Sequence, residues 1–139
     1  MLSTDQAKEL SGRVLSYSTL PECEVDLTST ETVFLRFANN GITTSGYQID
    51  QKVSVTSTTA DGRTGNAVIN ELSDDLLRRG VVQAEDLAKI SKPDPEHVTP
   101  LGPQKFPTLS NFDSFTANAR GDVMIPHVAA ILDTASRRS

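Results

Sequence analysis

Residues 49–70, IDQKVSVTSTTADGRTGNAVIN, decide how the fold of this 139-residue chain is interpreted. Their first part alternates apolar and polar residues, and Val53 and Val55 fall on the face that we expect to be buried. Asp61-Gly62 comes next, a dipeptide that favours the two-residue turn of a β-hairpin. Residues 63–70 are then predicted to return as a second, antiparallel strand.

One face of the first of these strands is polar and rich in hydroxyl groups. It carries Lys52, Ser54, Thr56 and Thr58. We interpret it as the solvated face of an antiparallel sheet. If an edge strand of this sheet is exposed, an extended peptide can pair with it by strand addition.

Three further strands are predicted upstream. Residues 22–29 alternate strictly, with Cys23, Val25 and Leu27 on one side. Residues 32–38 contain a single charge, so we expect them to form a central strand. Asn39-Asn40-Gly41 predicts a turn, because Asn and Gly tolerate positive φ, and residues 42–47 predict a short strand. Consecutive strands joined by short turns form an antiparallel meander.

Two helices are predicted to flank the strands. The first has Thr4 as its N-cap and is ended by Pro21, with apolar residues at helical spacing between them. The second follows Ser73, its expected N-cap, and carries Lys89 near its end, as the helix dipole favours. The apolar stripe of this second helix comprises Leu77, Gly80, Val81, Ala84, Leu87 and Ala88. Because a glycine lies on that stripe, we expect close packing there.

Residues 92–107 change character, because five prolines crowd into sixteen residues. Such a segment cannot be a regular helix or a central strand. Its Val98, Leu101 and Phe106 favour an ordered connector lying across a surface over a free linker.

A last helix is predicted to begin within residues 122–126. Its apolar residues at helical spacing are Val128, Ile131, Leu132 and Ala135. Arg137-Arg138-Ser139 follow directly, an end that fits either a natural domain or a truncated longer protein. We therefore expect one α+β domain over residues 1–139, in which an antiparallel β-meander packs with flanking helices and is followed by a Pro-rich connector and a C-terminal helix.

Composition narrows the class of partner. The formal net charge of −5 disfavours a dedicated binder of nucleic acids or anionic membranes. The first residues contain no apolar region of a signal peptide, and no apolar run approaches the length of a membrane span. Cys23 is the single cysteine, which excludes an internal disulfide. These features favour a cytoplasmic protein that contacts neither nucleic acid nor membrane directly.

No residue is assigned a catalytic or metal-binding role. The histidines are His97 and His127, and neither has a second histidine or cysteine at ligand spacing. Cys23 lies on the apolar face of a strand, and Glu22 and Glu24 beside it disfavour a reactive thiolate. No serine lies in a nucleophile elbow, and the glycines form no phosphate loop. We therefore expect no cofactor in this chain.

The residues that we expect to matter are mostly structural. Candidate turn residues and close-packing residues are Gly41, Asp61, Gly62, Gly65 and Gly80. Arg63, at the expected tip of the hairpin, is a candidate contact for a partner, although a solvated turn residue is the simpler interpretation.

An ordered series of short motifs runs through the chain. The pieces are Arg36-Phe37-Ala38-Asn39-Asn40-Gly41-Ile42, Val53-Ser54-Val55, Asp61-Gly62-Arg63-Thr64-Gly65, Leu72-Ser73-Asp74-Asp75-Leu76-Leu77-Arg78-Arg79 with Ala84 and Ala88, Pro93-Asp94-Pro95-Glu96 and Pro103-Gln104-Lys105-Phe106-Pro107. In order and spacing this series resembles the N-terminal domain of the TldD/PmbA family, over residues 5 to 138. Members of that family are called modulators of DNA gyrase and are also classed as metallopeptidases.

The resemblance implies an α+β domain of a much longer protein. In the family, the metal-binding His-Glu-x-x-x-His motif belongs to the C-terminal domain, which this chain lacks, so no catalytic residue is carried over. A zinc-type metal is expected in that missing domain if the parent is the active type of subunit. The resemblance also implies a homologous subunit as partner, in a homodimer or a heterodimer with a metal-free subunit.

The substrates implied by the resemblance are extended or unfolded peptides. The N-terminal domain is then expected to contribute to the substrate cleft and to supply a dimer surface. Two alternatives stay open at this point. One is a stand-alone protein-binding module related to gyrase or toxin–antitoxin modulation, and the other is a small enzyme that uses Cys23 or His97.

Overall fold

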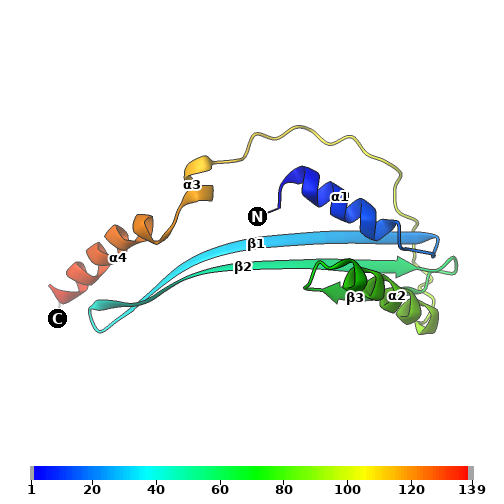
Figure 1. Cartoon of the computed structure of the whole chain (residues 1–139), viewed down its shortest axis with the longest axis horizontal. Coiled ribbons are helices and arrows are strands. Elements are labelled where there is room, and N and C mark those ends of the chain that lie inside the picture. The colour runs from blue at the N-terminus through cyan, green and yellow to red at the C-terminus, as the bar shows by residue number, and fades with distance from the viewer. Residues whose placement is uncertain (1, 138–139) are drawn as a thin grey trace. The chain divides into compact units, whose positions relative to one another are not determined.

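The computed structural model describes residues 2–137, so Arg138 and Ser139 of the expected C-terminal segment lie outside the described residues. The elements along the chain are α1 (Thr4–Leu15), β1 (Glu22–Ala38), β2 (Gly41–Thr58), β3 (Thr64–Ile69), α2 (Asp74–Ile90), α3 (Ser114–Asn118) and α4 (Gly121–Ser136) (Figure 1). An antiparallel sheet flanked by helices, with a C-terminal helix, confirms the predicted α+β class.

The sheet has the strand order β1-β2-β3, so each strand pairs with its neighbour in sequence. β2 and β3 are antiparallel in a register that runs from Val53 opposite Ile69 to Thr58 opposite Thr64. This confirms the meander and the hairpin that residues 49–70 predicted.

The predicted breaks within β1 and β2 were wrong, because these strands are 17 and 18 residues long. Polar residues such as Thr30 and Asp50 interrupt the alternation of side chains, but they do not interrupt backbone pairing, which any non-proline residue can make. The prediction of a central strand over residues 32–38 was also wrong. These residues belong to β1 at the edge of the sheet, and β2 is central.

The two hairpin turns place different types of residue in the left-handed backbone conformation with positive φ. Between β1 and β2 these are Asn39 and Asn40, with φ of 50° and 59°, as a type I′ turn requires. Gly41 is therefore not the residue that needs positive φ, and it begins β2 instead. Between β2 and β3, Gly62 has φ of 76°, and its N–H donates to the carbonyl of Thr59 at 3.0 Å. The loop is longer than the two residues predicted, because Thr59 pairs with Arg63 across it.

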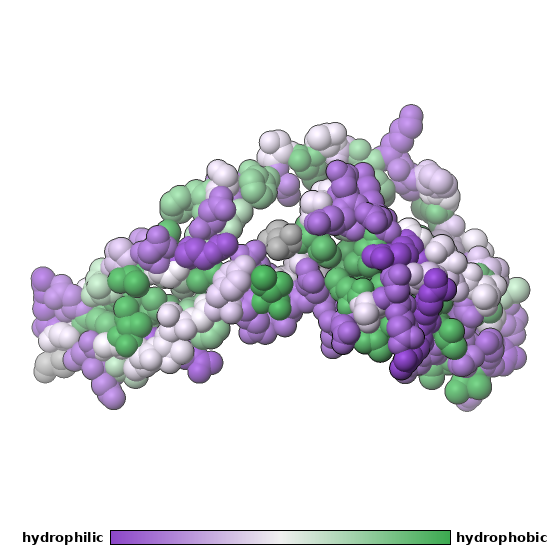
Figure 2. All heavy atoms as spheres, viewed as in Figure 1, coloured by the Kyte–Doolittle hydropathy of each residue, from purple (hydrophilic) through white to green (hydrophobic). Residues whose placement is uncertain are grey.

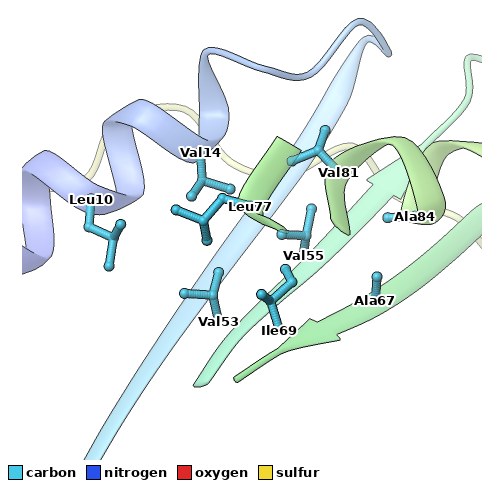
Figure 3. Close-up of a cluster of buried hydrophobic side chains, with 9 residues drawn as sticks. All are labelled: Leu10, Val14, Val53, Val55, Ala67, Ile69, Leu77, Val81 and Ala84. Carbon is cyan, nitrogen blue, oxygen red and sulfur yellow. The ribbon is translucent and has the colours of Figure 1, made fainter. Parts of the chain in front are cut away.

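The chain divides into two compact units. The first comprises the residues up to Thr30 and Asp50–Gln104, and the second comprises Glu31–Ile49 and the residues from Lys105 onward. In the first unit, α2 packs on β3, and α1 adds two side chains to the same core. The buried cluster is Leu10, Val14, Val53, Val55, Ala67, Ile69, Leu77, Val81 and Ala84 (Figure 3). Each fully buried valine or leucine contributes about 1.5–3 kcal/mol.

α1 begins one residue earlier than predicted, with Ser3 as its N-cap in a capping box with Gln6. It ends at Leu15, well before Pro21, so the proline does not end it. The chain needs the intervening residues to turn from α1 into β1.

α2 follows the predicted N-cap Ser73, and the glycine of its stripe is buried. The stripe was wrong at Leu87, which is 38% exposed. Glu85 takes a buried position on this side of the helix instead. Apolar periodicity alone could not indicate that a carboxylate of this helix would be buried.

The second unit contains the outer halves of β1 and β2 together with α3 and α4. α3 is a short helix that the sequence did not predict. α4 begins at Gly121, just ahead of the predicted region, and Pro126 lies inside it.

The Pro-rich connector has neither helix nor strand, as predicted. Its apolar side chains do not lie against a surface of the described residues, because Val98, Leu101 and Phe106 are 82–85% exposed. The expectation of a connector whose apolar side chains lie across a surface is therefore wrong for these three residues. Within residues 2–137, no helix is long and apolar enough to cross a membrane.

Candidate functional site

The turn between β2 and β3 joins the start of the connector. The carbonyl oxygen of Gly62 accepts a hydrogen bond of 3.1 Å from the N–H of Asp94. A Cβ added at Gly62 would lie 3.0 Å from the carbonyl oxygen of Asp94 and 3.0 Å from the Cβ of His97. Positive φ and close backbone approach therefore both favour glycine at this position.

Arg63 is held within the chain at this junction. Its Nε donates to Oδ2 of Asp61 at 2.7 Å, and its Nη1 lies 3.4 Å from the carbonyl oxygen of Ser91 and 3.5 Å from that of Lys89. These carbonyls lie at the C-terminus of α2, where a cation is favoured. The Thr59 hydroxyl, and then Arg63, hold the pKa of Asp61 below its ordinary value. Contact of Arg63 with a partner stays a prediction.

His97 ties the connector to the start of β1. Its Nε2 lies 3.0 Å from Oε2 of Glu22. Both atoms are shielded from water, and no other described residue provides either atom with a hydrogen bond. The pair thus joins two segments far apart in the sequence at a half-buried position.

Two glycines let β3 and α2 approach each other closely. A Cβ at Gly65 would lie 2.2 Å from the carbonyl oxygen of Ala84 and 2.3 Å from the nitrogen of Ala88. A Cβ at Gly80 would lie 2.4 Å from the side chain of Ile69. The structure thus brings Asp61, Gly62 and Arg63 together at one turn. Gly41, in the second unit, has only the carbonyl of Ala38 at 4.0 Å.

Glu85 forms a polar cluster that the sequence did not indicate. Its carboxylate accepts hydrogen bonds from the N–H and the hydroxyl of Thr19 at 2.6 and 2.7 Å, from the Ser18 hydroxyl at 3.2 Å and from the N–H of Leu20 at 3.3 Å. Burial raises the pKa of Glu85, but these hydrogen bonds outweigh it, so the pKa lies below its ordinary value. The signal in the sequence was a carboxylate at a core position of a helix, four residues after Val81.

A second cluster missed from the sequence lies in the second unit. Arg120 pairs with Glu31 at 2.9 Å and stacks on Tyr47, with its guanidinium carbon 5.2 Å from the ring centroid. The Tyr47 hydroxyl donates to Glu31 at 2.5 Å, and this hydrogen bond raises the pKa of Tyr47. The contact attaches the start of α4 to the outer part of the β1–β2 hairpin.

These residues do not fit a zinc ion. Within residues 2–137, no three side chains of His, Cys, Asp or Glu gather around a common point. His97 faces a single carboxylate, and His127 is exposed on α4. No metal-dependent step can be derived from this part of the chain.

The fold is of the α+β class, and polar side chains such as Glu85 and Arg120 hold backbone segments together within each unit. Residues 23–88 match the family model described as PmbA/TldA metallopeptidase domain 1. The crystal structure of TldE from Thermococcus kodakarensis is similar, with a TM-score of 0.78, 16% sequence identity and coverage of 96% of this chain. No curated protein matches.

Residues 23–88 are therefore similar to the first domain of the PmbA/TldA metallopeptidases, and the chain shares the fold of part of TldE. It spans 29% of the TldE chain that it matches, so it corresponds to less than a third of that relative's length.

Proposed function

We propose that this chain is the non-catalytic N-terminal part of a TldD/PmbA-type metallopeptidase, or of its metal-free partner subunit. The observation that carries the proposal is the match of residues 23–88 to the first domain of a metallopeptidase family. The coverage of only 29% of TldE supports a role within a longer assembly. Gyrase modulation and a cytoplasmic location remain predictions from the resemblance.

The proposed contribution to the substrate cleft is the free edge of β1. β1 is an edge strand of the sheet, and an extended peptide can add to such an edge through main-chain hydrogen bonds with little dependence on sequence. This supports unfolded polypeptides as substrates. In this proposal, a zinc-type metal in a further domain of the family carries out hydrolysis. The domain described here supplies a surface for dimer formation.

A metal and cleavage assay tests the first part of the proposal. We expect elemental mass spectrometry to find no stoichiometric zinc in residues 1–139. We also expect this chain to leave a fluorescein-labelled unfolded polypeptide uncleaved. Stoichiometric zinc, or zinc-dependent cleavage by this chain alone, would overturn the non-catalytic role.

Proline substitution tests the edge of β1. Within an edge strand, successive backbone N–H groups point alternately toward the neighbouring strand and toward the free edge. Of Glu24→Pro and Val25→Pro, one therefore removes an edge donor and the other removes a donor to β2. We expect the variant that loses the N–H group at the free edge to bind the labelled polypeptide more weakly and to remain folded. Unchanged binding by both variants contradicts the proposed cleft.

A further inference from the structure

The first residues of the connector are docked on the first unit, whereas the residues that follow are exposed. The N–H of Asp94 donates to the carbonyl of Gly62 at 3.1 Å, and the N–H of His97 donates to the carbonyl of Asp94 at 3.2 Å. Along residues 98–113 the large apolar side chains are 72–85% exposed, and Figure 2 shows apolar groups, drawn in green, at the surface along the connector. Residues 92–97 therefore form a strap, and His97 is its last docked residue.

The pair of His97 and Glu22 holds the end of this strap. Nε2 and Oε2 lie 3.0 Å apart, and the two side chains are 25% and 19% exposed. Neither atom is open to water or has a hydrogen bond with another described residue. Because an ionised carboxylate only accepts, the proton between the two atoms belongs to Nε2. A small displacement leaves two buried polar atoms without partners, which is costly, so the pair is either closed or fully released to water.

Other charged groups at this junction have partners of their own. Arg63 is paired with Asp61 at 2.7 Å, and Oδ1 of Asp94 accepts from the N–H of Glu96 at 2.9 Å. The first contact lies within the turn between β2 and β3, and the second lies within the strap. Neither joins the strap to β1, which is what the pair of His97 and Glu22 does.

Two prolines, Pro93 and Pro95, restrict the strap after release. The ring of each proline fixes its own φ and also limits the residue before it. A released strap therefore has fewer conformations to lose when it docks again. This favours docking and release of the whole segment.

We propose that residues 92–97 dock and release as one strap, that the pair of His97 and Glu22 is its latch, and that the latch sets how much of the connector is free. With the latch closed, the free chain runs from Val98 to the start of α3 at Ser114. Release adds the six residues of the strap, which lengthens the reach of the connector by roughly 20 Å at full extension. His97 is thus a positioning residue, and the inference does not rest on the proposed function.

Amide exchange followed by NMR tests whether the strap opens by itself. The N–H of Asp94 should exchange faster than that of the buried Val81. Low urea should speed exchange at Val81 but not at Asp94, because release of a strap exposes little surface. Equal protection and equal urea dependence at the two sites mean that the strap opens only when the whole unit unfolds, and they overturn the proposal.

Substitution of the histidine tests the latch. His97→Ala removes the donor of the pair, so the N–H of Asp94 should exchange at least about threefold faster. His127→Ala makes the same change at an exposed histidine of α4 and should leave exchange at Asp94 unchanged. An unchanged rate in His97→Ala overturns the proposal.

Substitution of the carboxylate tests whether the two residues act together. Glu22→Ala should speed exchange at Asp94 as much as His97→Ala does, and the double variant should exchange no faster than either. Glu22→Gln keeps an acceptor for the Nε2–H group and should retain most of the protection. Additive effects in the double variant overturn the proposal.

Proteolysis tests the free length of the connector. Glutamyl endopeptidase cleaves after Glu96 within the strap, and cleavage requires that the strap is released. It should be faster in Glu22→Ala than in Glu24→Ala, which is the matched change at an exposed glutamate of β1. Equal rates of cleavage after Glu96 in the two variants overturn the proposal.

Discussion

The carboxylate of Glu85 accepts a hydrogen bond of 2.6 Å from the backbone N–H of Thr19, a residue 66 positions earlier in the chain. Glu85 is 5% exposed, and the hydroxyl of Thr19 donates to its other oxygen. One buried carboxylate of α2 thus holds the segment that connects α1 to β1.

Replacement of Glu85 by glutamine should lower the free energy of unfolding by about 1–3 kcal/mol. The amide cannot accept from all of the donors that the carboxylate satisfies, so buried N–H and O–H groups lose their partners. Urea unfolding at pH 7 measures the change. Glu71→Gln removes the same charge at an exposed position and should change stability by less than about 0.5 kcal/mol. Equal effects of the two substitutions would refute the role of Glu85.

The stability that Glu85 contributes should depend on pH. Because its pKa in the folded chain is lowered from the ordinary 4.5, the contribution is complete above pH 4.5 and is lost as pH falls through the folded pKa. The difference in unfolding free energy between the unmodified chain and Glu85→Gln should therefore shrink between pH 5 and pH 3. A difference that stays constant over this range contradicts the prediction.

Gly65→Ala should destabilise the chain by about 3 kcal/mol or more, since the added methyl would lie 2.2 Å from a backbone oxygen of α2 that cannot move independently. Gly12→Ala is the matched control. Gly12 lies within α1 with no atom within 4 Å of an added Cβ, so alanine there should stabilise by about 0.5–1 kcal/mol. The two melting temperatures should shift in opposite directions.

Gly62→Val should cost about 1–3 kcal/mol, because a β-branched residue disfavours the φ of 76° and would contact Asp94 and His97. Gly41→Val makes the same change at a position without positive φ and with open space, and should be nearly neutral. Amide exchange should also show faster opening of Asp94 in Gly62→Val. An unchanged melting temperature for Gly62→Val would contradict the prediction.

Tyr47 should titrate above its ordinary pKa of 10.0, because its hydroxyl donates to the Glu31 carboxylate and ionisation would break that hydrogen bond. Ultraviolet difference titration of the two tyrosines measures this. Glu31→Gln should lower the pKa of Tyr47, whereas Glu24→Gln, on the same strand, should not. Identical titration curves for the three proteins contradict the assignment.

Much of the fold followed from local patterns. Ser73 and the dipole-matched charges of α2 predicted that helix, and the alternation around Val53 and Val55 predicted the β2–β3 hairpin. The lengths of β1 and β2 could not be predicted, because the side chains of their outer halves show no regular alternation of buried and exposed positions. Pro21 was a poor guide to the end of α1, because a helix can stop before a proline is reached.

The polar clusters were predictable only in part. The sequence indicated the turn at Asp61 and Gly62, since turn chemistry is local. It gave no pairing for Glu85 with Thr19, or for Arg120 with Glu31, because these contacts join residues that only the tertiary fold brings together. A lone glutamate at a core position of a helix is the signal to use: such a residue implies buried donors from another segment.

The neighbour-by-neighbour order of the sheet has a consequence for the speed of folding. β2, β3 and α2 follow one another within residues 41–90, and the loop between the paired strands is short, so closing it costs little chain entropy. Chains in which contacting residues lie close together in the sequence fold rapidly. We expect this segment to act as the folding nucleus, with α1 docking late because Thr19 must find Glu85 across most of the first unit. Destabilising changes in α1 should then speed unfolding more than they slow folding.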